Sequence, residues 1–289
     1  MLFRSDLIPE EDLIVTLSKA GYAKTQPLDT YQAQNRGGTG KRAASLKDED
    51  FVSKLFVANT HDTLLCFSSY GKVYWIKVYR LPRGGRNAKG RPIVNLLPLE
   101  KDERIQAVLP VKEFNDDQFI FMATETGSVK KTKLSAYSRP MKSGIKAIKL
   151  RDGDRVVNAE ITDGTKEIML FSNSGKSIRF KESDARPMGR VSQGVRGMRI
   201  DKDQKIISLV VLEEGNILVA TENGYGKQTL QDEFSIQKRG GKGVIAIQTS
   251  DRNRNLIGAK QVNTGDEVMF ISTSGNLIRT RTDDISIIG

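Results

Sequence analysis

Glycines recur in pairs along this 289-residue chain, and the pairs repeat about every fifty residues. Successive first glycines are 50, 56, 48, 49 and 51 residues apart, at Gly21, Gly71, Gly127, Gly175, Gly224 and Gly275. A second glycine follows 17 or 19 residues after each of the first five, at Gly40, Gly90, Gly144, Gly194 and Gly243. A fixed period of this length indicates one supersecondary unit copied along the chain, so the sequence predicts a repeat architecture.

Each repeat contains the pattern of four short strands. The first glycine lies between an apolar run, such as residues 168–171, and a segment of alternating apolar and basic residues, such as 177–181. Ser-Gly or Asn-Gly at this point supplies the positive φ of a tight hairpin turn. Beyond the second glycine we expect a third strand, at 94–97, 145–150, 195–200 and 244–247. After an acidic turn we expect a fourth strand, at 105–111, 156–161 and 206–212.

Four strands in about fifty residues is the composition of a propeller blade. The sequence therefore predicts an all-β, propeller-like fold in a single domain over residues 1–289. The repeats are expected to start near residues 14, 64, 119, 168, 217 and 268. The sixth repeat has a first hairpin but no second glycine before Gly289. We therefore expect an incomplete sixth blade, and we expect the chain to be one domain of a larger protein.

Basic residues are concentrated in the same part of every repeat. Five segments around the glycine pairs, together 112 residues, contain 30 Lys and Arg but 5 Asp and Glu: 20–42, 72–91, 128–151, 175–199 and 224–243. The other 177 residues carry 16 basic and 30 acidic residues, so the net charge of +11 conceals two opposite distributions. Equivalent positions of a radial repeat lie at equivalent places on the ring, so this bias predicts a continuous basic band.

Positions four and six after the first glycine are both basic in three repeats: Lys131 and Lys133, Arg179 and Lys181, Arg279 and Arg281. An offset of two residues on a strand puts both side chains on one face, and we expect that face to be exposed. Basic residues on exposed strands also serve solubility and edge protection. That use would mix both signs of charge, whereas segments 72–91 and 128–151 contain no acid.

A curved basic band fits a stiff polyanion that bends around it, so duplex DNA is the expected partner. Phosphate contacts supply an affinity that is independent of base sequence and falls steeply with salt. No segment resembles a recognition helix, so we expect little direct base readout. The expected rim contacts are Lys41, Arg42, Arg83, Arg86, Lys89, Arg91, Lys131, Lys133, Arg139, Lys142, Arg179, Lys181, Arg186, Arg190, Lys227, Arg279 and Arg281.

Two glycine-rich loops belong to the same band and are further candidate DNA contacts. The first-repeat loop is Gln34, Asn35, Arg36, Gly37, Gly38, Thr39 and Gly40. The fifth-repeat loop is Gln237, Lys238, Arg239, Gly240, Gly241, Lys242 and Gly243. Glycine lets the backbone turn sharply and approach a phosphate closely, although a plain surface turn has the same composition. Neither is the phosphate loop of a nucleotide enzyme, because no Gly-Lys-Ser/Thr opens a helix after it.

The chain resembles the C-terminal domains of bacterial DNA gyrase A subunits over essentially its whole length. The most specific stretches are Phe-Val-Ala-Asn-Thr-His-Asp at 56–62, Cys-Phe-Ser-Ser at 66–69, Gly-Arg-Pro-Ile-Val-Asn-Leu-Leu-Pro-Leu at 90–99 and Asn-Gly-Tyr-Gly-Lys at 223–227. The resemblance implies a six-bladed β-pinwheel, a propeller-like ring whose blades exchange strands. It also implies chiral wrapping of duplex DNA around the basic rim, which enables gyrase to introduce negative supercoils.

The same family has a signature heptad in its first blade, the gyrase A box: Gln, a basic residue, Arg, Gly, Gly, a basic residue, Gly. Residues 34–40 occupy this place, but Asn35 and Thr39 stand where the family has basic side chains. Residues 237–243 match the pattern in full, although they lie in the fifth repeat. One hypothesis is that the second heptad compensates for the weaker first one. The alternative is drift between copies of one repeat.

Little in the sequence indicates an enzyme. His61 is the single histidine, which excludes a cluster of histidine metal ligands and leaves one candidate for a catalytic triad. We expect His61 to be structural, acidic turns such as Asp102-Glu103 to be solvated, and Cys66 to be a small buried hydrophobe in a reducing compartment. The family cleaves DNA with a tyrosine of its N-terminal region, so the resemblance implies a non-catalytic domain. We expect no metal and no cofactor.

The resemblance implies as partners duplex DNA, the rest of the gyrase A polypeptide, and the gyrase B polypeptide in an A2B2 holoenzyme, with the isolated domain monomeric. No apolar stretch has the length of a membrane span, so we expect a cytoplasmic, nucleoid-associated protein without a membrane partner. Two alternatives remain open. One is the C-terminal domain of the topoisomerase IV counterpart of gyrase A, which bends DNA or senses its geometry. The other is a protein-interaction propeller, which would present an apolar or mixed-charge face.

Overall fold

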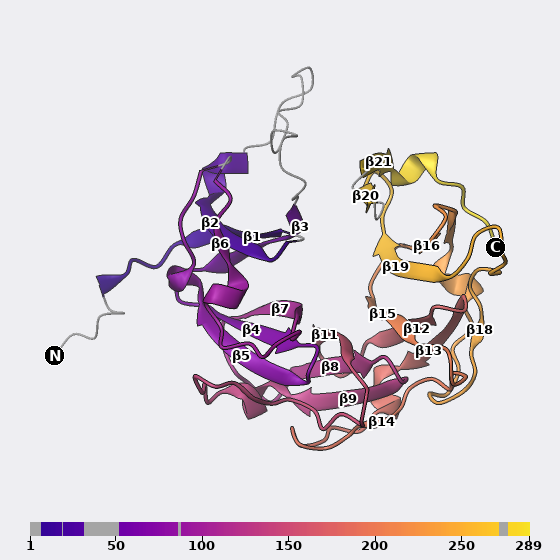
Figure 1. The fold of residues 1–289 in the computed structure, drawn as a ribbon, viewed down its shortest axis with the longest axis horizontal. Coiled ribbons are helices and arrows are strands. Elements are labelled where there is room, and N and C mark those ends of the chain that lie inside the picture. Colours follow the sequence, from indigo (N-terminus) through magenta and orange to yellow (C-terminus); the bar gives the residue numbers. More distant parts are fainter. Residues whose placement is uncertain (1–6, 19, 32–51, 86–87, 272–276) are drawn as a thin grey trace.

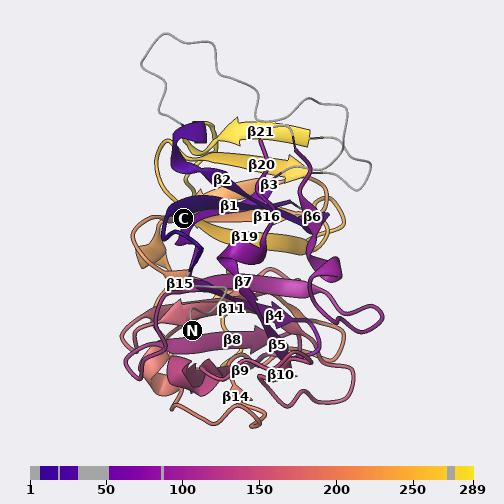
Figure 2. The same ribbon diagram turned by 90° about the vertical axis from the view of Figure 1, so that its left-hand side faces the viewer.

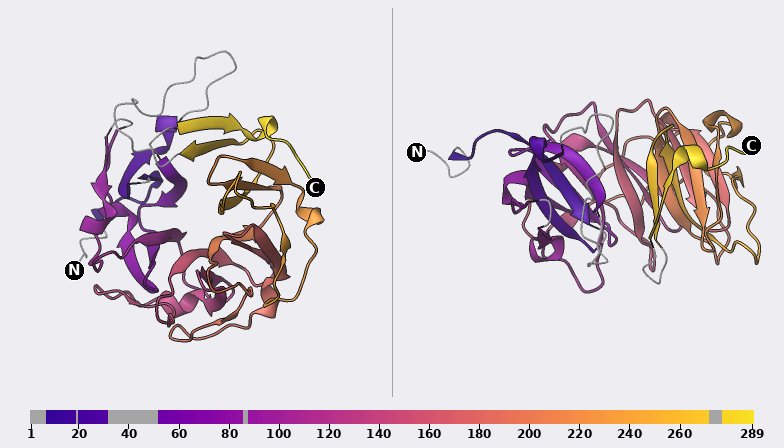
Figure 3. Two further views of the ribbon diagram at one scale, coloured as in Figure 1. Left: turned by 45° about the vertical axis from the view of Figure 1, so that its right-hand side comes forward. Right: turned by 90° about the horizontal axis from the view of Figure 1, so that it is seen from above.

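The computed structural model describes residues 7–18, 20–31, 52–85, 88–271 and 277–289. This part of the chain contains strands and short 3-10 turns but no α-helix. Figure 1 shows the sheets arranged as blades around a common centre, in sequence order from indigo to yellow. Figure 3 shows the same arrangement from two further sides. In the side view of Figure 2, most strands run across the thickness of the ring, and the sheets are stacked from β20 and β21 at the top to β14 at the bottom.

Four blades have four strands each, ordered from the centre outwards. The first contains β3 (Val52–Asn59), β1 (Asp12–Ser18), β2 (Tyr22–Pro27) and β6 (Arg91–Pro92). The second contains β7 (Ile105–Val111), β4 (Thr63–Ser68), β5 (Lys72–Lys77) and β10 (Ile145–Lys146). The third contains β11 (Val156–Thr162), β8 (Phe119–Thr124), β9 (Ser128–Lys133) and β14 (Val195–Arg196). The fourth contains β15 (Ile206–Leu212), β12 (Glu167–Ser172), β13 (Lys176–Lys181) and β18 (Val244–Ile245).

The last two sheets are smaller. The fifth contains β19 (Leu256–Val262), β16 (Asn216–Thr221) and β17 (Gly226–Thr229), and the sixth is the hairpin of β20 (Glu267–Ile271) and β21 (Leu277–Arg281). The prediction of an all-β, propeller-like fold is confirmed. The expected count of six blades of four strands, the sixth of them incomplete, is corrected to five blades, the fifth with three strands, and one hairpin within the described residues.

Short 3-10 turns follow the second strand of each repeat: η2 (Leu28–Tyr31), η3 (Val78–Arg80), η5 (Leu134–Tyr137), η6 (Glu182–Asp184), η7 (Gln231–Glu233) and η8 (Thr282–Asp284). A further turn, η4 (Ile93–Asn95), begins directly after β6. The expected third strands are therefore corrected: the one at 94–97 lies beyond β6, and the other three are shorter than expected. The segment at 94–97 is partly a 3-10 turn, and its counterparts pair over two residues each, because their next amides bond to a turn instead of a strand.

Each outer strand comes from the following repeat. β6 of the second repeat pairs with β2 of the first, with Arg91 opposite Ala23. In the same way β10 pairs with β5, β14 with β9, and β18 with β13. Neighbouring blades therefore exchange strands, as the sequence resemblance implied, and each of these four sheets is complete only with a piece of the next repeat.

The glycine pair is the device that holds the exchanged strand. The carbonyl oxygen of Gly175 accepts hydrogen bonds from the amides of Ala246 (2.8 Å) and Ile247 (3.1 Å), just beyond the exchanged β18. The second glycine, Gly243, lies so close to Ser177 on the receiving strand that a Cβ would collide with the Ser177 carbonyl oxygen. Both glycines have positive φ, 81° and 74°, where a side chain would be strained. The fifty-residue glycine period is thus the period of strand exchange.

The apolar core lies between blades instead of at the centre of the ring. On β4, Leu64 and Cys66 pack toward the first blade, whereas Leu65 and Phe67 pack toward the third. All four side chains are buried, because successive residues of a strand face opposite sides and both sides are covered. The apolar runs before each first glycine are continuous for this reason.

Gly243→Ala should destabilise the fold more than Gly224→Ala. The two glycines have similar φ values, 74° and 80°, so both substitutions bring a similar backbone strain, about 1–2 kcal/mol. Only at Gly243 does the new methyl group meet a carbonyl oxygen, whereas the space around Gly224 is open. Overpacking of this kind costs a further ~1–3 kcal/mol. Denaturant midpoints measure the difference, and equal midpoints would contradict an anchoring role for Gly243.

Candidate nucleic-acid interface

Four basic arms run along the outer edge of the blades. An arm is the stretch of chain from the end of a 3-10 turn to the end of the exchanged strand, and the four complete arms are 81–92, 138–146, 185–196 and 234–245. Each arm lies on the second strand of the preceding blade, as the parallel bridges of Lys131 to Pro187 and Arg179 to Ile236 show. The four arms contain 13 Lys and Arg and no Asp or Glu.

Most arm cations point to solvent. Ten are exposed: Arg83, Lys89, Arg91, Arg139, Lys142, Lys146, Arg186, Arg196, Lys238 and Lys242. Arg190 and Arg239 are half-buried. Of the expected contacts outside the arms, Lys133, Lys181, Arg279 and Arg281 are exposed and Lys227 is half-buried. The expected residues Lys41, Arg42 and Arg86, and the whole first heptad at 34–40, lie outside the described residues.

Three of the expected rim cations form ion pairs on the surface within the described part of the chain. Arg83 pairs with Glu11, Arg279 pairs with Glu267, and Lys133 Nζ lies 3.7 Å from Asp116 Oδ2. Exposed pairs of this kind contribute about 0–1 kcal/mol. They therefore present little obstacle to an incoming phosphate.

Two expected rim cations are buried, which corrects the prediction that they line an exposed face. Arg179 is 8% exposed; its Nε donates to Glu167 Oε2 (2.7 Å) and its Nη1 to the carbonyl oxygens of Gln231 (2.8 Å) and Phe234 (3.0 Å). Lys131 is 4% exposed, and its Nζ donates to the Glu182 carbonyl oxygen at 3.3 Å. The physical reason is that the 3-10 turn of the next repeat covers this position.

The same position carries an inter-blade hydrogen bond in other repeats, with different chemistry. Trp75 Nε1 donates to the Tyr137 carbonyl oxygen (2.8 Å), and Gln228 Nε2 donates to those of Thr282 (2.6 Å) and Ile285 (3.0 Å). A tryptophan, a lysine, an arginine and a glutamine share only the ability to donate to a carbonyl. Position four is therefore a connection between blades, and its charge in two repeats is incidental to the rim.

Two buried lysines hold arms in place, and sequence reasoning did not single them out. Lys130 is fully buried, and its Nζ donates to the carbonyl oxygens of Ala147 (2.6 Å) and Arg190. Lys24 reaches the carbonyl oxygens of Gly85 (3.1 Å) and Ala88 (2.8 Å) in the same way. Burial, and then the charge of Arg190, lower the pKa of Lys130 to about 7. Burial also lowers the pKa of Lys24.

The backbone just beyond the end of one arm also bonds to the next arm. The Lys149 amide donates to the Ser192 carbonyl oxygen (3.1 Å), and the Arg199 amide donates to that of Gly241 (2.8 Å). Lys146, Lys149, Arg196 and Arg199 are exposed at these junctions and were absent from the expected set. The sequence could have identified them, since a basic residue recurs two and five residues after the second glycine in these two repeats.

The fifth-repeat heptad, residues 237–243, forms a loop on the fourth blade. The Gln237 amide donates to the Arg179 carbonyl oxygen (2.8 Å), and the Gly240 amide donates to that of Gly197 (2.6 Å). Lys238 and Lys242 are exposed. The loop therefore presents two free lysines from a backbone fixed at both ends.

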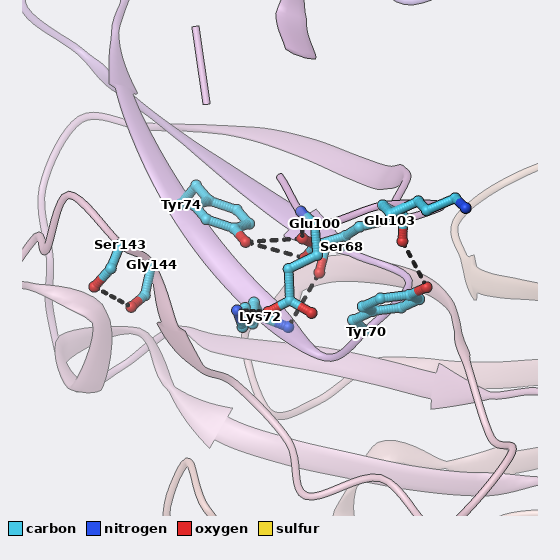
Figure 4. Close-up of polar contacts among 9 residues, drawn as sticks. Ser68, Tyr70, Lys72, Tyr74, Glu100, Glu103, Ser143 and Gly144 are labelled. Atoms are coloured by element: carbon cyan, nitrogen blue, oxygen red, sulfur yellow. Dashed lines mark hydrogen bonds and ion pairs between the residues drawn. The ribbon is translucent and has the colours of Figure 1, made fainter. Parts of the chain in front are cut away.

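The acidic turns are partly buried, which corrects the expectation that they are solvated. Glu103 is 5% exposed; its Oε2 accepts hydrogen bonds from the Tyr74 hydroxyl (3.0 Å) and the Glu100 amide (2.8 Å) (Figure 4). Asp154 is 2% exposed, and its Oδ2 accepts from the Thr126 hydroxyl at 2.7 Å. The last acid of these two turns thus fastens the neighbouring hairpin. Burial, and then the hydrogen bond to Glu103, raise the pKa of Tyr74.

The described residues contain no group of three His, Cys, Asp or Glu side chains that could hold a metal ion. His61 Nε2 lies 2.8 Å from the Ile8 carbonyl oxygen, which fits the expected structural role. Cys66 is buried as expected, and burial raises the pKa of its thiol to about 12. No helix in this part of the chain is long and apolar enough to cross a membrane.

Comparison with known protein families identifies the family to which this chain belongs. A family model described as "DNA gyrase C-terminal domain, beta-propeller" matches residues 12–59, 62–112, 118–163, 166–213, 215–263 and 266–289. The chain belongs to the DNA gyrase C-terminal domain family. The resemblance inferred from the sequence is thereby confirmed, and the family is a propeller domain at the C-terminal end of DNA gyrase A subunits.

Sequence relatives are gyrase A subunits. The DNA gyrase A protein of Salmonella typhimurium is 53% identical over 98% of this chain and 32% of that protein. The gyrase A protein of Escherichia coli is 54% identical over 98% of this chain and 33% of that protein. The chain thus spans about a third of the length of these curated relatives.

Solved structures of two related domains share the fold. The C-terminal domain of a DNA topoisomerase IV superposes with a TM-score of 0.84 and 28% identity, covering 98% of this chain and 87% of that chain. A DNA gyrase A C-terminal domain superposes with a TM-score of 0.73 and 28% identity, covering 96% of this chain and 92% of that chain. The fold is therefore shared with both solved domains, and the sequence match assigns the gyrase family.

Lys130→Met should remove a rise of stability with pH. A lysine in the unfolded chain has a pKa of 10.5, but burial lowers the pKa of Lys130 in the folded protein to about 7. At a pH between these two pKa values the unfolded state binds more protons, so the free energy of unfolding rises with pH. The destabilisation caused by burying the charged lysine is complete only below the folded-state pKa. Urea unfolding of both proteins between about pH 7 and about pH 10 should show the wild type gaining on the variant. A difference that stays constant would contradict this cause.

Proposed function

We propose that this domain binds duplex DNA without sequence specificity and wraps it around the arms with one handedness. The observation that carries the proposal is the set of four acid-free arms, whose exposed cations repeat once per blade along the outer edge. A band of one charge sign that follows a curve favours a curved polyanion. Of the remaining expected contacts, Lys133 and Lys181 end second strands that carry an arm, whereas Lys227, Arg279 and Arg281 lie on the second strands of the last two sheets.

The energetics of wrapping are favourable for such a band. Bending a duplex of about two to three turns costs on the order of 1–6 kcal/mol. Phosphate contacts release counterions, and each one adds about 0.9 to the slope of affinity against salt. Because Lys149 and Arg199, just beyond the ends of two arms, bond to the next arm, contacts can continue from one blade to the next.

The two heptads have unequal parts in this proposal. The first-repeat heptad keeps Arg36 but has Asn35 and Thr39 at two usually basic positions, whereas the fifth-repeat heptad has exposed lysines at both, Lys238 and Lys242. We propose that these lysines contact phosphate and compensate for the charges missing from the first heptad.

The relatives' names support a place in a holoenzyme. They are DNA gyrase A subunits, and we propose that this domain acts with the remainder of a gyrase A polypeptide and with the gyrase B polypeptide in an A2B2 complex. Wrapping would present a crossing DNA segment to the cleaving core, so that ATP-dependent gyrase introduces negative supercoils. With duplex DNA as its partner, the domain is proposed to lie at the nucleoid in the bacterial cytoplasm. The isolated domain is proposed to be monomeric.

A second candidate function follows from the higher TM-score of the topoisomerase IV domain, 0.84 against 0.73. A domain of that kind bends DNA or senses its geometry without chiral wrapping. The two functions differ in the linking number that they leave on a closed circular DNA.

The 289-residue chain bound to relaxed circular DNA should trap positive writhe. A nicking-closing enzyme fixes the linking number in the presence of the protein, and two-dimensional gels read it after the protein is removed. Chiral wrapping shifts the linking number in proportion to bound protein, because each copy contributes the same sign. Retardation of the DNA with no shift would support bending and contradict the proposed wrapping.

Arg139→Ala with Lys142→Ala should weaken binding to a short duplex and reduce its dependence on salt. Both side chains are exposed on the third-repeat arm, and losing two phosphate contacts lowers the slope of log affinity against log salt by about 1.8. The control is Lys202→Ala, an exposed lysine between two acids of a turn. If the control had an equal effect, or if the slope in the double variant were unchanged, the DNA would not contact Arg139 and Lys142.

A further inference from the structure

We propose that Arg239, the arginine of the fifth-repeat heptad, is a positioning residue that clamps the heptad loop to the preceding arm and makes no phosphate contact itself. The phosphate contacts fall to Lys238 and Lys242 beside it. This inference rests on the proposed binding of duplex DNA by the arms.

The guanidinium of Arg239 joins the two ends of the fourth-repeat arm. Its Nε donates to the Asp184 carbonyl oxygen (2.8 Å), just before that arm begins, and its Nη1 donates to the carbonyl oxygen of Arg196 (3.0 Å), where the arm ends. The planar fork of an arginine suits two fixed acceptors in different directions. The side chain is half-buried in this position, whereas Lys238 and Lys242 are exposed.

Other blades perform the same task from the opposite side. In the first and third blades, the third residue after the first glycine is a buried lysine, Lys24 or Lys130, which reaches outward to carbonyl oxygens of the overlying arm. In the fourth blade that position is Ile178, which has no donor, and Gly241 of the heptad loop packs against it. The cation has moved from the strand to the loop, and its acceptors are still backbone carbonyl oxygens.

The clamp fixes the backbone that carries the free lysines. Beside Arg239, the Gly240 amide donates to the Gly197 carbonyl oxygen (2.6 Å) and the Gly241 carbonyl oxygen accepts from the Arg199 amide (2.8 Å). These bonds join two arms, so Lys238 and Lys242 stand next to the exposed Arg196 and Arg199. Without the clamp the same charges would remain, but their spacing along the DNA would not be set.

The test separates charge from position in the 289-residue chain. Arg239→Ala is compared with Lys242→Ala, which removes one charge from the same loop. Three quantities are measured: the salt slope of binding to a duplex too short to wrap, the writhe trapped on a relaxed circle, and hydrogen exchange of the Gly240 amide without DNA.

We expect Arg239→Ala to lose trapped writhe and to speed Gly240 exchange by about tenfold or more, as the loss of a charged hydrogen bond does. Its salt slope should change little. Lys242→Ala should lower the slope by about 0.9 and leave Gly240 exchange unchanged. Adding Ile178→Lys to Arg239→Ala should restore slow exchange and writhe, because a lysine there can reach the loop as Lys24 and Lys130 do.

The clamp is overturned if Arg239→Ala lowers the slope as Lys242→Ala does and leaves Gly240 exchange unchanged, since that result marks a direct phosphate contact. If the interior lysine prevents folding, the two single variants still decide the question. A wild-type chain without salt-dependent DNA binding would refute the proposed function instead. In that case Gly240 exchange in Arg239→Ala would still support or overturn the clamp.

Discussion

The exchanged strand is the constraint on which the rest of this structure depends. Gly175 offers its carbonyl oxygen to two amides of the fifth repeat, and Gly243 allows that repeat to approach Ser177. Because a Cβ on Gly175 would collide with the Ile247 carbonyl oxygen and a Cβ on Gly243 with that of Ser177, the glycines cannot vary freely. The arms exist as a result, since the chain must cross from its own blade to the one before it. Their place on the outer edge follows from the sheet order, in which the exchanged strand is outermost.

The cations of each repeat serve two physical purposes that a charge count cannot separate. Some, such as Lys130 and Arg179, are buried and donate to backbone carbonyl oxygens, which compensates for the cost of removing them from water. Others, such as Lys142 and Lys242, are exposed on the arms. The interior group fixes the blades and loops on which the exposed group stands. A basic rim of defined curvature therefore depends on cations that never reach the surface.

The sequence was sufficient for the fold because its glycine period and apolar runs record backbone requirements directly. Strands 105–111 and 206–212 were predicted with their observed bounds, since they are mainly apolar segments between turns. The exchange could not be derived from the residues alone, because it depends on which neighbour a two-residue strand joins. Lys131 and Lys133 look alike on one strand, yet only the first lies under the next repeat's 3-10 turn. Burial of that kind is a property of the neighbour, not of the strand.

Strand exchange also determines the order in which this molecule can be assembled. The second strand of the fourth blade, Lys176–Lys181, waits for Val244–Ile245, which leaves the ribosome about seventy residues later. Each sheet therefore keeps an open outer edge until the following repeat has been synthesised, and a nascent chain always carries one unfinished blade at its growing end. Exposed strand edges are sites of misassociation. The interval between one repeat and the next is thus the period when this protein is most exposed to mispairing with its own copies.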